Sequence, residues 1–395
     1  MNIIKSLHLH NFKCFEDQTI AFAPLTMLAG LNGQGKSSVL QSLLLLRQSY
    51  QQGLLRPTTQ TDEFSSRLAL KGDLVQLGTG KDIYFEGGQD ELIDIEVTWQ
   101  SNDKLSLSFK YETDDDTLKL AQSQPFTMHL QTALFHHDFQ YLQAERLGPR
   151  PFFEMSNFQV GEKRQLGTRG EYTTHFLSVY GNEKITNEIM AHRNAISLNL
   201  IHQVEAWLSE MSSRNTRLEL TPLPGIDLIS LNYSFVTEQQ VSQPYRSVNV
   251  GFGFTYSLPI LVAILSAKPG ALLLLENPEA HLHPKGQAVL AELMVRAAKC
   301  GVQIVVETHS DHLINRLRRL VAEDLSNELA GLINILFVQQ SDDQRSSYIE
   351  PLRLNDEGQI ENWPPNFLIE TAEDARAIVK AGIAKRRQMK GTNTP

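Results

Sequence analysis

Residues 30–37 read Gly-Leu-Asn-Gly-Gln-Gly-Lys-Ser, which matches the pattern GxxxxGK[ST] of a phosphate-binding loop. An apolar segment at 20–28 precedes this loop and predicts a strand, and residues 36–47 carry apolar side chains at helical spacing. Such a loop binds phosphate between a strand and the start of a helix, because the helix N-terminus supplies converging N–H groups. The flanking sequence therefore satisfies the context that the pattern requires.

Each residue type in the loop has a physical task. Glycines let main-chain N–H groups approach phosphate oxygens, the lysine reaches the β and γ phosphates, and the serine hydroxyl can bind magnesium. A Gly-rich turn that arose by chance does not need the Lys36–Ser37 pair. We expect ATP and Mg²⁺ as cofactors, with contacts from Gly30, Asn32, Gly33, Gln34, Gly35, Lys36, Ser37 and Ser38.

The composition is that of an ordinary globular protein. The chain has 395 residues, 41% hydrophobic and 21% charged, which excludes wholesale disorder and fibrous classes. Its two cysteines, Cys14 and Cys300, define neither a disulfide framework nor a metal cluster. The N-terminus lacks an apolar signal segment, and the longest apolar stretches are too short to span a bilayer. We expect a protein of the reducing cytoplasm that has no membrane partner.

The net charge bears on nucleic-acid binding. A charge of -9 argues against a surface that coats nucleic acid non-specifically, although a local basic groove stays compatible with it. The basic runs at 316–319 and 385–387 are more typical of solvated helix faces than of nucleic-acid sites. Nucleic acid therefore stays open as a partner.

The rest of the chain predicts an α/β fold. Residues 3–9 form an expected strand, and the alternation along 83–118 predicts antiparallel strands beside it. Residues 184–211 carry apolar side chains at helical spacing, which predicts one or two helices projecting between the halves. Residues 271–307 show two continuous apolar strands around a helix, the pattern of a buried parallel sheet.

A second acidic motif lies at the end of the strand that begins near Leu272. A phosphate loop needs a carboxylate on a neighbouring strand end for the magnesium shell, and Glu276 in Glu276-Asn277-Pro278-Glu279 can supply it. The alternative is a buried strand that simply ends in solvent-facing acids.

The histidines near this motif admit two interpretations. His281, His283, His309 and His312 lie among carboxylates, as zinc ligands do, but none stands in an HExxH arrangement. His309 follows an apolar strand, so a sensor of the γ-phosphate at that strand end is the interpretation we favour. A purely structural histidine is the remaining alternative.

These motifs together resemble the ABC-type ATPase heads of the SMC and overcoming-lysogenization-defect group. The opening residues 8–22 are similar to the strand that precedes the phosphate loop in that group. A bacterial family of stand-alone AAA-type ATPases with a short C-terminal domain of unassigned function is more similar still, and Septu-type defence ATPases are its relatives. The patches that carry this resemblance are 141–150, 250–260, 276–287, 307–318 and 362–367.

The resemblance implies roles for individual residues. Glu276 would occupy the Walker B aspartate position and His309 the switch position, while Gln76 would be a counterpart of the glutamine that senses magnesium. Gly251 and Gly253 stand where such ATPases carry a signature loop that caps phosphate on the opposite subunit of a dimer. The sequence GFGFTY departs from the usual serine-glycine-glycine form, and the start of an apolar helix is the alternative for this stretch.

The departure with the largest consequence is Asn277, which stands where relatives carry a catalytic glutamate. An amide cannot accept a proton as a general base. Hydrolysis is then slow, or Glu279 replaces the missing base, or a partner completes the site. The alternative for Glu279 is a carboxylate at a helix start, stabilised by the helix dipole.

The block around Gly148-Pro149 has two interpretations. An internal Glu145–Arg146 ion pair or a structural turn is the simpler one. Contact of Arg150 with phosphate or DNA is the other.

We therefore predict an α/β, ABC-type P-loop NTPase head with an antiparallel β subdomain and an inserted α-helical middle. The expected divisions are 1–130 and 246–345 for the two halves of the head, 131–245 for the middle, and 346–395 for a small C-terminal domain with a frayed tail.

The resemblance implies an ATPase whose catalytic residues are Glu276, Glu279 and His309 and whose magnesium site includes Ser37, Gln76 and Glu276. Its hydrolysis is slow if nothing replaces the base missing at Asn277. It also implies a homodimer or higher homo-oligomer, paired around ATP, that controls a separate, nuclease-like effector in anti-phage defence or DNA surveillance. The competing hypothesis is a regulatory scaffold that binds ATP and barely hydrolyses it. A DNA-repair clamp of the SMC type would need a long heptad insert, and the middle carries none.

Overall fold

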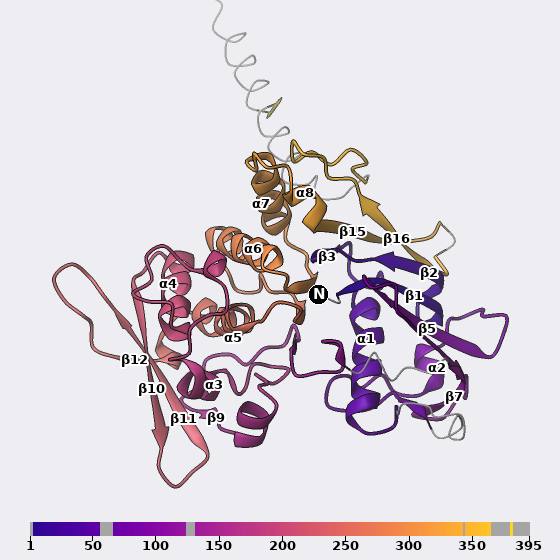
Figure 1. Ribbon diagram of the computed structural model, residues 1–395, viewed down its shortest axis with the longest axis horizontal. Helices are drawn as coiled ribbons and strands as arrows, with labels where there is room; N and C mark the ends of the chain where they lie inside the picture. Colours follow the sequence, from indigo (N-terminus) through magenta and orange to yellow (C-terminus); the bar gives the residue numbers. More distant parts are fainter. Residues whose placement is uncertain (1–2, 56–65, 124–130, 343, 365–379, 382–395) are drawn as a thin grey trace, which may run out of the picture.

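The computed structural model describes residues 3–55, 66–123, 131–342, 344–364 and 380–381. Its central sheet has six strands in the order β16-β15-β3-β14-β13-β8. Figure 1 labels β16, β15 and β3 of this sheet. All neighbouring pairs in this sheet are parallel except β15 with β16. The strands are β3 (Leu25–Ala29), β8 (Phe139–Leu142), β13 (Leu272–Glu276), β14 (Gln303–Glu307), β15 (Ile333–Gln340) and β16 (Ser347–Leu352). The predicted parallel sheet is confirmed.

The central sheet separates two hydrophobic cores, because side chains alternate between the faces of a strand. Leu273 and Ile304 belong to one core, and their neighbours Leu274 and Val305 belong to the other. Both faces are covered, which explains why these strands are continuously apolar instead of alternating.

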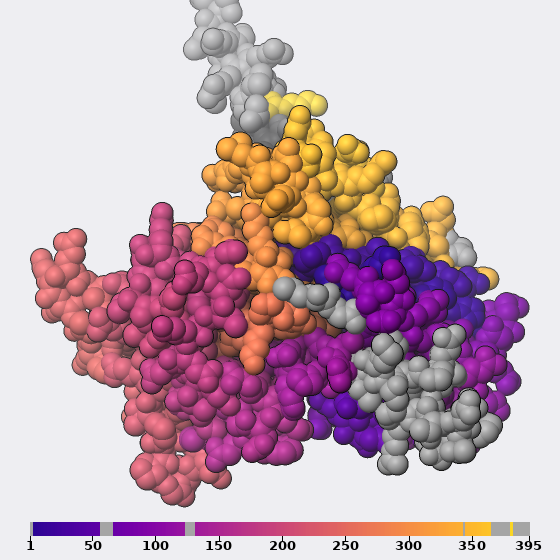
Figure 2. Space-filling view, in the orientation of Figure 1, coloured from indigo at the N-terminus to yellow at the C-terminus, as the bar shows by residue number. Residues whose placement is uncertain are grey.

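Helices from the C-terminal half cover the first face of the sheet. They are α5 (Phe252–Ser266), α6 (Pro284–Lys299), α7 (Asp311–Ala322) and the short α8 (Leu329–Leu332). The second face packs against α1 (Lys36–Gln51) and the second sheet, through residues such as Leu43 and Leu107. In Figure 2 the orange residues of the C-terminal half lie between the magenta middle region and the indigo N-terminal half.

The second sheet is antiparallel and has the order β2-β1-β5-β6-β7-β4. Its elements are β1 (Ile4–Phe12), β2 (Phe15–Ala21), β4 (Arg67–Ala69), β5 (Leu92–Trp99), β6 (Lys104–Lys110) and β7 (Thr117–Ser123), with α2 (Gly80–Ile83) between β4 and β5. The expected strands beside 3–9 are confirmed, since β5 pairs with β1.

The single strand expected at 20–28 is wrong. The chain forms β2 up to Ala21 and β3 from Leu25, and the two strands belong to different sheets. Pro24 lies between them, and a proline has no N–H group for a strand ladder. The break moves the chain from the antiparallel sheet into the parallel one, directly before the phosphate loop.

The middle of the chain carries helices and a small sheet of its own. Its elements are β9 (Phe153–Glu154), the π-helix η2 (Phe158–Glu162), α3 (Thr173–Tyr180), the 3₁₀ turn η3 (Glu188–Met190), α4 (Leu200–Ser212), β10 (Thr216–Leu223), β11 (Leu228–Phe235), β12 (Tyr245–Arg246) and the 3₁₀ turn η4 (Ser247–Asn249). The sheet has the order β10-β11-β12, with β9 also paired to β11. The sequence reading did not anticipate this sheet.

The helical expectation for 184–211 holds only from Leu200 onward, and α4 does not project. Val204 and Trp207 pack into the core that α5 and α6 share, so the middle region is joined to the C-terminal half (Figure 1). The apolar residues before Leu200, such as Ile185 and Met190, enter the same core from loops and the η3 turn. Helical spacing arose there without a helix.

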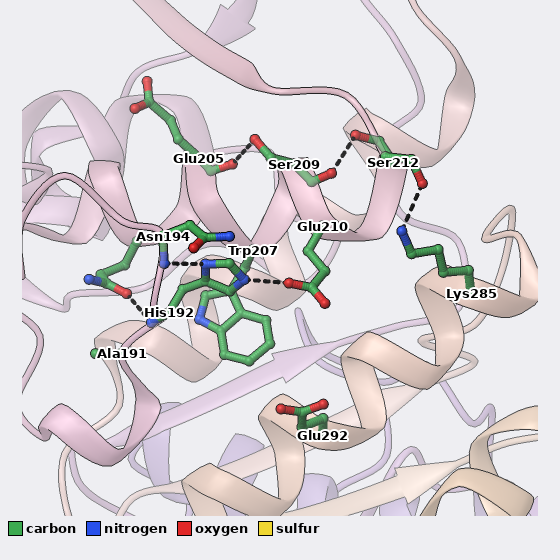
Figure 3. A network of polar contacts seen from close by, with 12 residues as sticks. Ala191, His192, Asn194, Glu205, Trp207, Ser209, Glu210, Ser212, Lys285 and Glu292 are labelled. Carbon is green, nitrogen blue, oxygen red and sulfur yellow. Dashed lines mark hydrogen bonds and ion pairs between the residues drawn. The ribbon is translucent and has the colours of Figure 1, made fainter.

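A buried histidine fixes the loop before α4 (Figure 3). The Asn194 N–H group donates to His192 Nδ1 (3.2 Å), so Nε2 carries the ring hydrogen and donates to Glu210 on α4 (2.7 Å). The ring lies edge-on to Trp207, and the Arg296 guanidinium of α6 lies over the indole. The loop, α4 and α6 are thereby held as one packed unit.

The C-terminal segment starts inside the main sheet, because β16 pairs along β15. Most of the predicted domain at 346–395 lies outside the described residues, as do the basic run 385–387 and the tail expected to fray. Of the helices that the structure describes, none is both long enough and apolar enough to cross a membrane.

Candidate functional site

The phosphate loop connects β3 to α1 in a conformation that requires glycine at two points. Gly30 has φ 143°, and a Cβ there would collide with the Val338 carbonyl oxygen on β15. Gly35, the N-cap of α1, has φ 103°, and a Cβ there would collide with Cys14 Sγ. Both positions combine a positive φ with close approach, which only glycine accommodates.

Lys36 lies within its own loop. The side chain is 3% exposed, and Nζ donates to the carbonyl oxygens of Gly30 (3.0 Å) and Leu31 (2.7 Å). Burial lowers the pKa of the Lys36 ammonium, while the carboxylates of Glu307 and Glu279 oppose the shift. The Lys36 ammonium therefore lies in the loop, close enough to Glu307 and Glu279 for their charges to act on it.

Ser37 faces Glu307, an acid that the sequence motifs did not assign to the magnesium site. Its Oγ donates to Glu307 Oε1 at 2.9 Å. Glu307 ends β14, is 7% exposed, and its pKa is raised by burial and by neighbouring Glu276, against the Ser37 hydrogen bond. The available signal was the acid that ends both apolar strands, LLLLE and QIVVE.

Glu276 ends β13 beside Glu307, since the two residues are paired in register across β13 and β14. Tyr141 Oη donates to its Oε1 (2.8 Å), and the Ala144 N–H group donates to its Oε2 (3.0 Å). Burial and the Glu276 charge raise the pKa of Tyr141 above its ordinary value, which keeps the phenol as a donor. Both oxygens of Glu276 therefore have a protein donor.

Glu279 is joined to the predicted switch histidine. Its Oε1 accepts from the His309 N–H group at 2.8 Å, and its Oε2 is buried without a partner among the described residues. It is not a carboxylate at the start of α6, which begins at Pro284. Partial burial and the nearby Lys36 charge lower the pKa of His309, so its exposed imidazole is neutral near pH 7.

Asn277 occupies a left-handed turn after β13, with φ 42°. Its N–H group donates to the Glu307 carbonyl oxygen (2.8 Å), which ties the two strand ends together. Its side-chain Oδ1 is buried and has no partner in the part of the chain that the structure describes. The amide lies at the site, but it offers no general base.

Arg146 fixes this turn from behind. The side chain is 1% exposed, and its guanidinium donates to the carbonyl oxygens of Gln143 (3.1 Å), Glu276 (2.7 Å), Asn277 (2.8 Å) and Tyr256 (3.2 Å). Burial lowers the pKa of Arg146 to about 10, so the group stays charged at pH 7. One side chain thereby connects the acidic turn to α5.

The expected Glu145–Arg146 ion pair is wrong. Glu145 is exposed and pairs with Arg169 (3.2 Å), because it points away from the buried carbonyls that Arg146 binds. The side chain of Arg150 is exposed, and its carbonyl oxygen accepts from Ser247 Oγ. A phosphate or DNA contact for Arg150 stays a prediction.

The predicted signature loop forms the start of α5, so both interpretations of this stretch hold in part. Gly251 is the N-cap, and Gly251 and Phe252 are exposed. A Cβ on Gly253 would lie 3.0 Å from the His281 carbonyl oxygen. These glycines line a cavity of about 320 Å³ with Phe254, His281 and Lys285. The first N–H groups of α5 have no side-chain cap, as an anion site at a helix start requires.

The remaining predicted residues are distributed around this centre. Asn32 and Gly33 are exposed on the loop, Gln34 Oε1 accepts from the Gln340 N–H group (2.9 Å), and Ser38 is buried in α1. Gln76 is exposed after β4, on a loop that Gln48 of α1 holds through the N–H groups of 74 and 75. Its part in a magnesium site stays a prediction.

The other histidines and the basic run have structural partners. His281 packs against Tyr256 with ring centroids 4.3 Å apart and ring planes tilted by 55°, and His283 Nδ1 caps α6 by accepting from the Lys285 N–H group. Arg316 pairs with Glu292 and Arg319 with Glu323, so the run 316–319 is largely paired.

A phosphate loop beside two acidic ends of parallel strands defines the class of the protein, a P-loop NTPase. Residues 25–315 match the family described as "AAA domain, putative AbiEii toxin, Type IV TA system", and the chain belongs to this family. No curated protein matches the sequence significantly.

Solved structures place the fold among SMC heads. An Smc head domain with a coiled coil and joint from Pyrococcus yayanosii is 11% identical, with a TM-score of 0.55, and the match covers 95% of this chain and 100% of that one. An SmcHead bound to the C-winged helix domain of ScpA is 14% identical, with a TM-score of 0.51 and coverage of 89% and 98%. The predicted ABC-type head fold is confirmed.

Proposed function

We propose that this chain binds ATP with Mg²⁺, associates in pairs around the nucleotide and thereby controls a separate effector. The observation that carries the proposal is the position of Lys36 and Ser37 opposite the acids Glu276, Glu279 and Glu307. The N-terminus of α1 and the Lys36 ammonium would bind the triphosphate. The Ser37 hydroxyl and the acids would bind its magnesium ion.

The chain's own residues have distinct tasks in this proposal. The N–H groups of 33–36 cradle the phosphates, and Lys36 exchanges its loop carbonyls for phosphate oxygens. The donor set suits magnesium, since it offers a hydroxyl and carboxylates, and two of their oxygens, on Glu279 and Glu307, are buried without a partner among the described residues. Magnesium there would neutralise charge on the phosphates.

His309 can couple the bound nucleotide to the turn that contains Asn277 and Glu279. Its imidazole is exposed beside Lys36, and its N–H group is held by Glu279. A neutral imidazole can donate one hydrogen bond to a γ-phosphate oxygen, and Glu279 can accept from water on the same side. Binding of the γ-phosphate would thus act on the turn that contains Asn277 and Glu279.

The start of α5 supports pairing. Gly251 and Phe252 are exposed, and no side chain caps the start of α5 beside them, so its first N–H groups can bind an anion outside the phosphate loop of their own chain. A second copy related by a twofold axis would place each α5 start over the partner's nucleotide. Glycine at 253 lets main chain approach that phosphate.

An effector is proposed by analogy with an assembly of known structure. One similar SMC head is bound to a winged-helix domain of ScpA, so this fold can carry a partner on a head domain. A nuclease-like effector, a relation to Septu-type ATPases and a role in anti-phage defence or DNA surveillance rest on the sequence resemblance. Location in the cytoplasm belongs to the same proposal.

A second function is favoured by Asn277. Without a carboxylate at this point, and with Glu279 Oε1 engaged by His309, water activation is weak, and general-base assistance is typically worth about 10² to 10⁴ in rate. The alternative is a scaffold that binds ATP and barely hydrolyses it. Steady-state turnover by the wild type, compared with its ATP affinity, separates the two functions.

The proposed ATP site is tested through Lys36. Lys36→Ala removes the only side-chain cation of the loop, and we expect ATP affinity to fall at least tenfold, about 1.4 kcal/mol. Isothermal titration calorimetry with ATP and Mg²⁺ measures the loss. Lys71→Ala, which removes an exposed lysine paired with Asp116, is the matched control and should bind as wild type does. Undiminished binding by Lys36→Ala would refute the site.

A further inference from the structure

The carboxylate best placed to bind magnesium is not the one that ends the Walker B strand. β14 lies between β3, which leads into the phosphate loop, and β13, which ends in Glu276. The acid that ends β14 is Glu307, one strand nearer to the loop. Ser37 makes its side-chain hydrogen bond to Glu307.

Strand alternation places Glu307 on the correct face of the sheet. Val305, two residues earlier, packs in the core that α1 shares, whereas Val306 packs in the other core. A residue two positions along a strand points to the same side, so the Glu307 carboxylate lies on the α1 side, as the 2.9 Å contact from Ser37 requires.

Glu276 and Glu307 differ in how many of their carboxylate oxygens accept a hydrogen bond from the protein. Glu276 accepts from Tyr141 Oη on one oxygen and from the Ala144 N–H group on the other. Glu307 accepts from Ser37 on Oε1, while Oε2 is buried and unpartnered within the described residues. A buried oxygen of an acid that is 7% exposed is costly unless something binds it.

Lys36 does not compensate this charge directly. Its Nζ donates to Gly30 and Leu31 carbonyls, and it acts on Glu307 only through their Coulomb attraction. A divalent cation that is bound by a serine hydroxyl and a carboxylate oxygen is the ligand whose chemistry fits this pair. Magnesium also keeps several waters and takes phosphate oxygens, so two protein ligands are sufficient.

We propose that Glu307, together with Ser37, holds the Mg²⁺ that accompanies the nucleotide, and that Glu276 is a positioning residue. Glu276 fixes the Tyr141 phenol and the Ala144 main chain beside the ion. This assignment rests on the proposed ATP function and adds to it a metal ligand on the neighbouring strand.

The test compares nucleotide binding with and without the metal. Affinity for a fluorescent N-methylanthraniloyl derivative of ATP is measured in excess Mg²⁺ and in excess EDTA, and the ratio defines the Mg²⁺ increment. We expect wild type to show an increment of at least about tenfold, Glu307→Gln to lose it, and Glu276→Gln to keep most of it. In EDTA, Glu307→Gln should bind at least as tightly as wild type, because a negative charge next to the phosphates is gone.

A second readout separates ligand binding from a structural role. Glutamine keeps the acceptor for Ser37 and removes a buried charge, so Glu307→Gln without nucleotide should have a melting temperature equal to or above that of wild type. A residue that only supports the fold would lower it. Ser37→Ala combined with Glu307→Gln should lose no more of the Mg²⁺ increment than either variant alone, since both act on one ion.

The outcomes separate the proposed ATP function from the assignment of Glu307 as the metal ligand. If wild type binds the nucleotide with an Mg²⁺ increment that survives Glu307→Gln, the ATP function stands and Glu307 is not the metal ligand. If Glu276→Gln alone abolishes the increment, the metal belongs to Glu276. If wild type binds no nucleotide in either buffer, the proposed function fails, and the assignment of Glu307 fails with it.

Discussion

Replacing Arg146 with methionine tests whether one buried guanidinium holds the acidic turn in place. The side chain is 1% exposed and donates to main-chain carbonyl oxygens at four residues, 143, 256, 276 and 277. Methionine fills similar volume and offers no donor. Four carbonyl oxygens then lose a charged donor inside the protein, so we expect a loss of about 3 to 5 kcal/mol, the usual cost of breaking a buried charged network.

The expected change in melting temperature follows from the size of the chain. Unfolding entropy near 2.1 cal/mol/K per residue gives about 0.8 kcal/mol/K for 395 residues, so a loss of about 4 kcal/mol corresponds to roughly 5 °C. Differential scanning calorimetry measures this shift. Arg146→Lys should fall between wild type and Arg146→Met, because an ammonium keeps the charge but has only three donors in another geometry.

Arg169→Met is the matched control for Arg146→Met. Arg169 lies in a loop beside that of Arg146, since the Leu147 N–H group donates to its carbonyl oxygen, but its ion pair with Glu145 is largely exposed, with side-chain exposures of 39% and 83%. Exposed pairs typically contribute about 0 to 1 kcal/mol, so its melting temperature should change by about 1 °C at most. Equal shifts for both variants, or an Arg146→Met protein as stable as wild type, would refute the structural role given to Arg146.

Three further predictions concern association, rate and pH. Gly253→Trp should leave ATP binding intact and abolish ATP-dependent pairing in light scattering; identical assembly with and without ATP would contradict it. Asn277→Glu should raise steady-state hydrolysis and Glu279→Gln should lower it, whereas fast wild-type turnover indifferent to both would place the base elsewhere. Glu292→Gln should lower stability to urea by about 1 kcal/mol at pH 7. Burial raises the pKa of Glu292, but hydrogen bonds and charges from Arg296 and Arg316 outweigh burial and lower the pKa in the folded state. The ionised Glu292 therefore stabilises the fold above the unfolded pKa of about 4.3, and this stabilisation is lost as the pH falls below that value through the folded pKa. A difference that persists at pH 3 would contradict it.

Local sequence patterns predicted the nucleotide-binding core. The strand, loop and helix around Lys36 and the parallel pair β13–β14 depend on short-range rules: glycine where φ is positive, and apolar runs where both sheet faces are covered. The break at Pro24 was also visible in the sequence, because proline cannot donate to a ladder, but the apolar run across it suggested one strand.

Contacts between distant segments were beyond the reach of such rules. Arg146 meets the carbonyl oxygen of Tyr256 across 110 positions, and Ser37 meets Glu307 across 270. Arg146 is buried because its own loop, the end of β13 and α5 meet around its side chain, and the sequence pattern of one segment carries no information on that. The small sheet of the middle region was missed for another reason: β10 and β11 form a local hairpin, and the alternation of Ile229, Leu231 and Tyr233 with polar residues was visible in the sequence but was overlooked.

The identity of residue 277 follows from the backbone as much as from chemistry. Its φ of 42° lies in the left-handed region, which asparagine tolerates better than most other residues. A glutamate in this turn would be strained, whereas an acid at the end of β14 lies in extended backbone and reaches Ser37 without strain. The site therefore has its second carboxylate on the neighbouring strand, in register with Glu276. In the proposal above, this carboxylate serves the ion, so Glu279, whose Oε1 accepts from the His309 N–H group, is the acid left to activate water. We therefore expect slow turnover and long-lived ATP binding by the wild type.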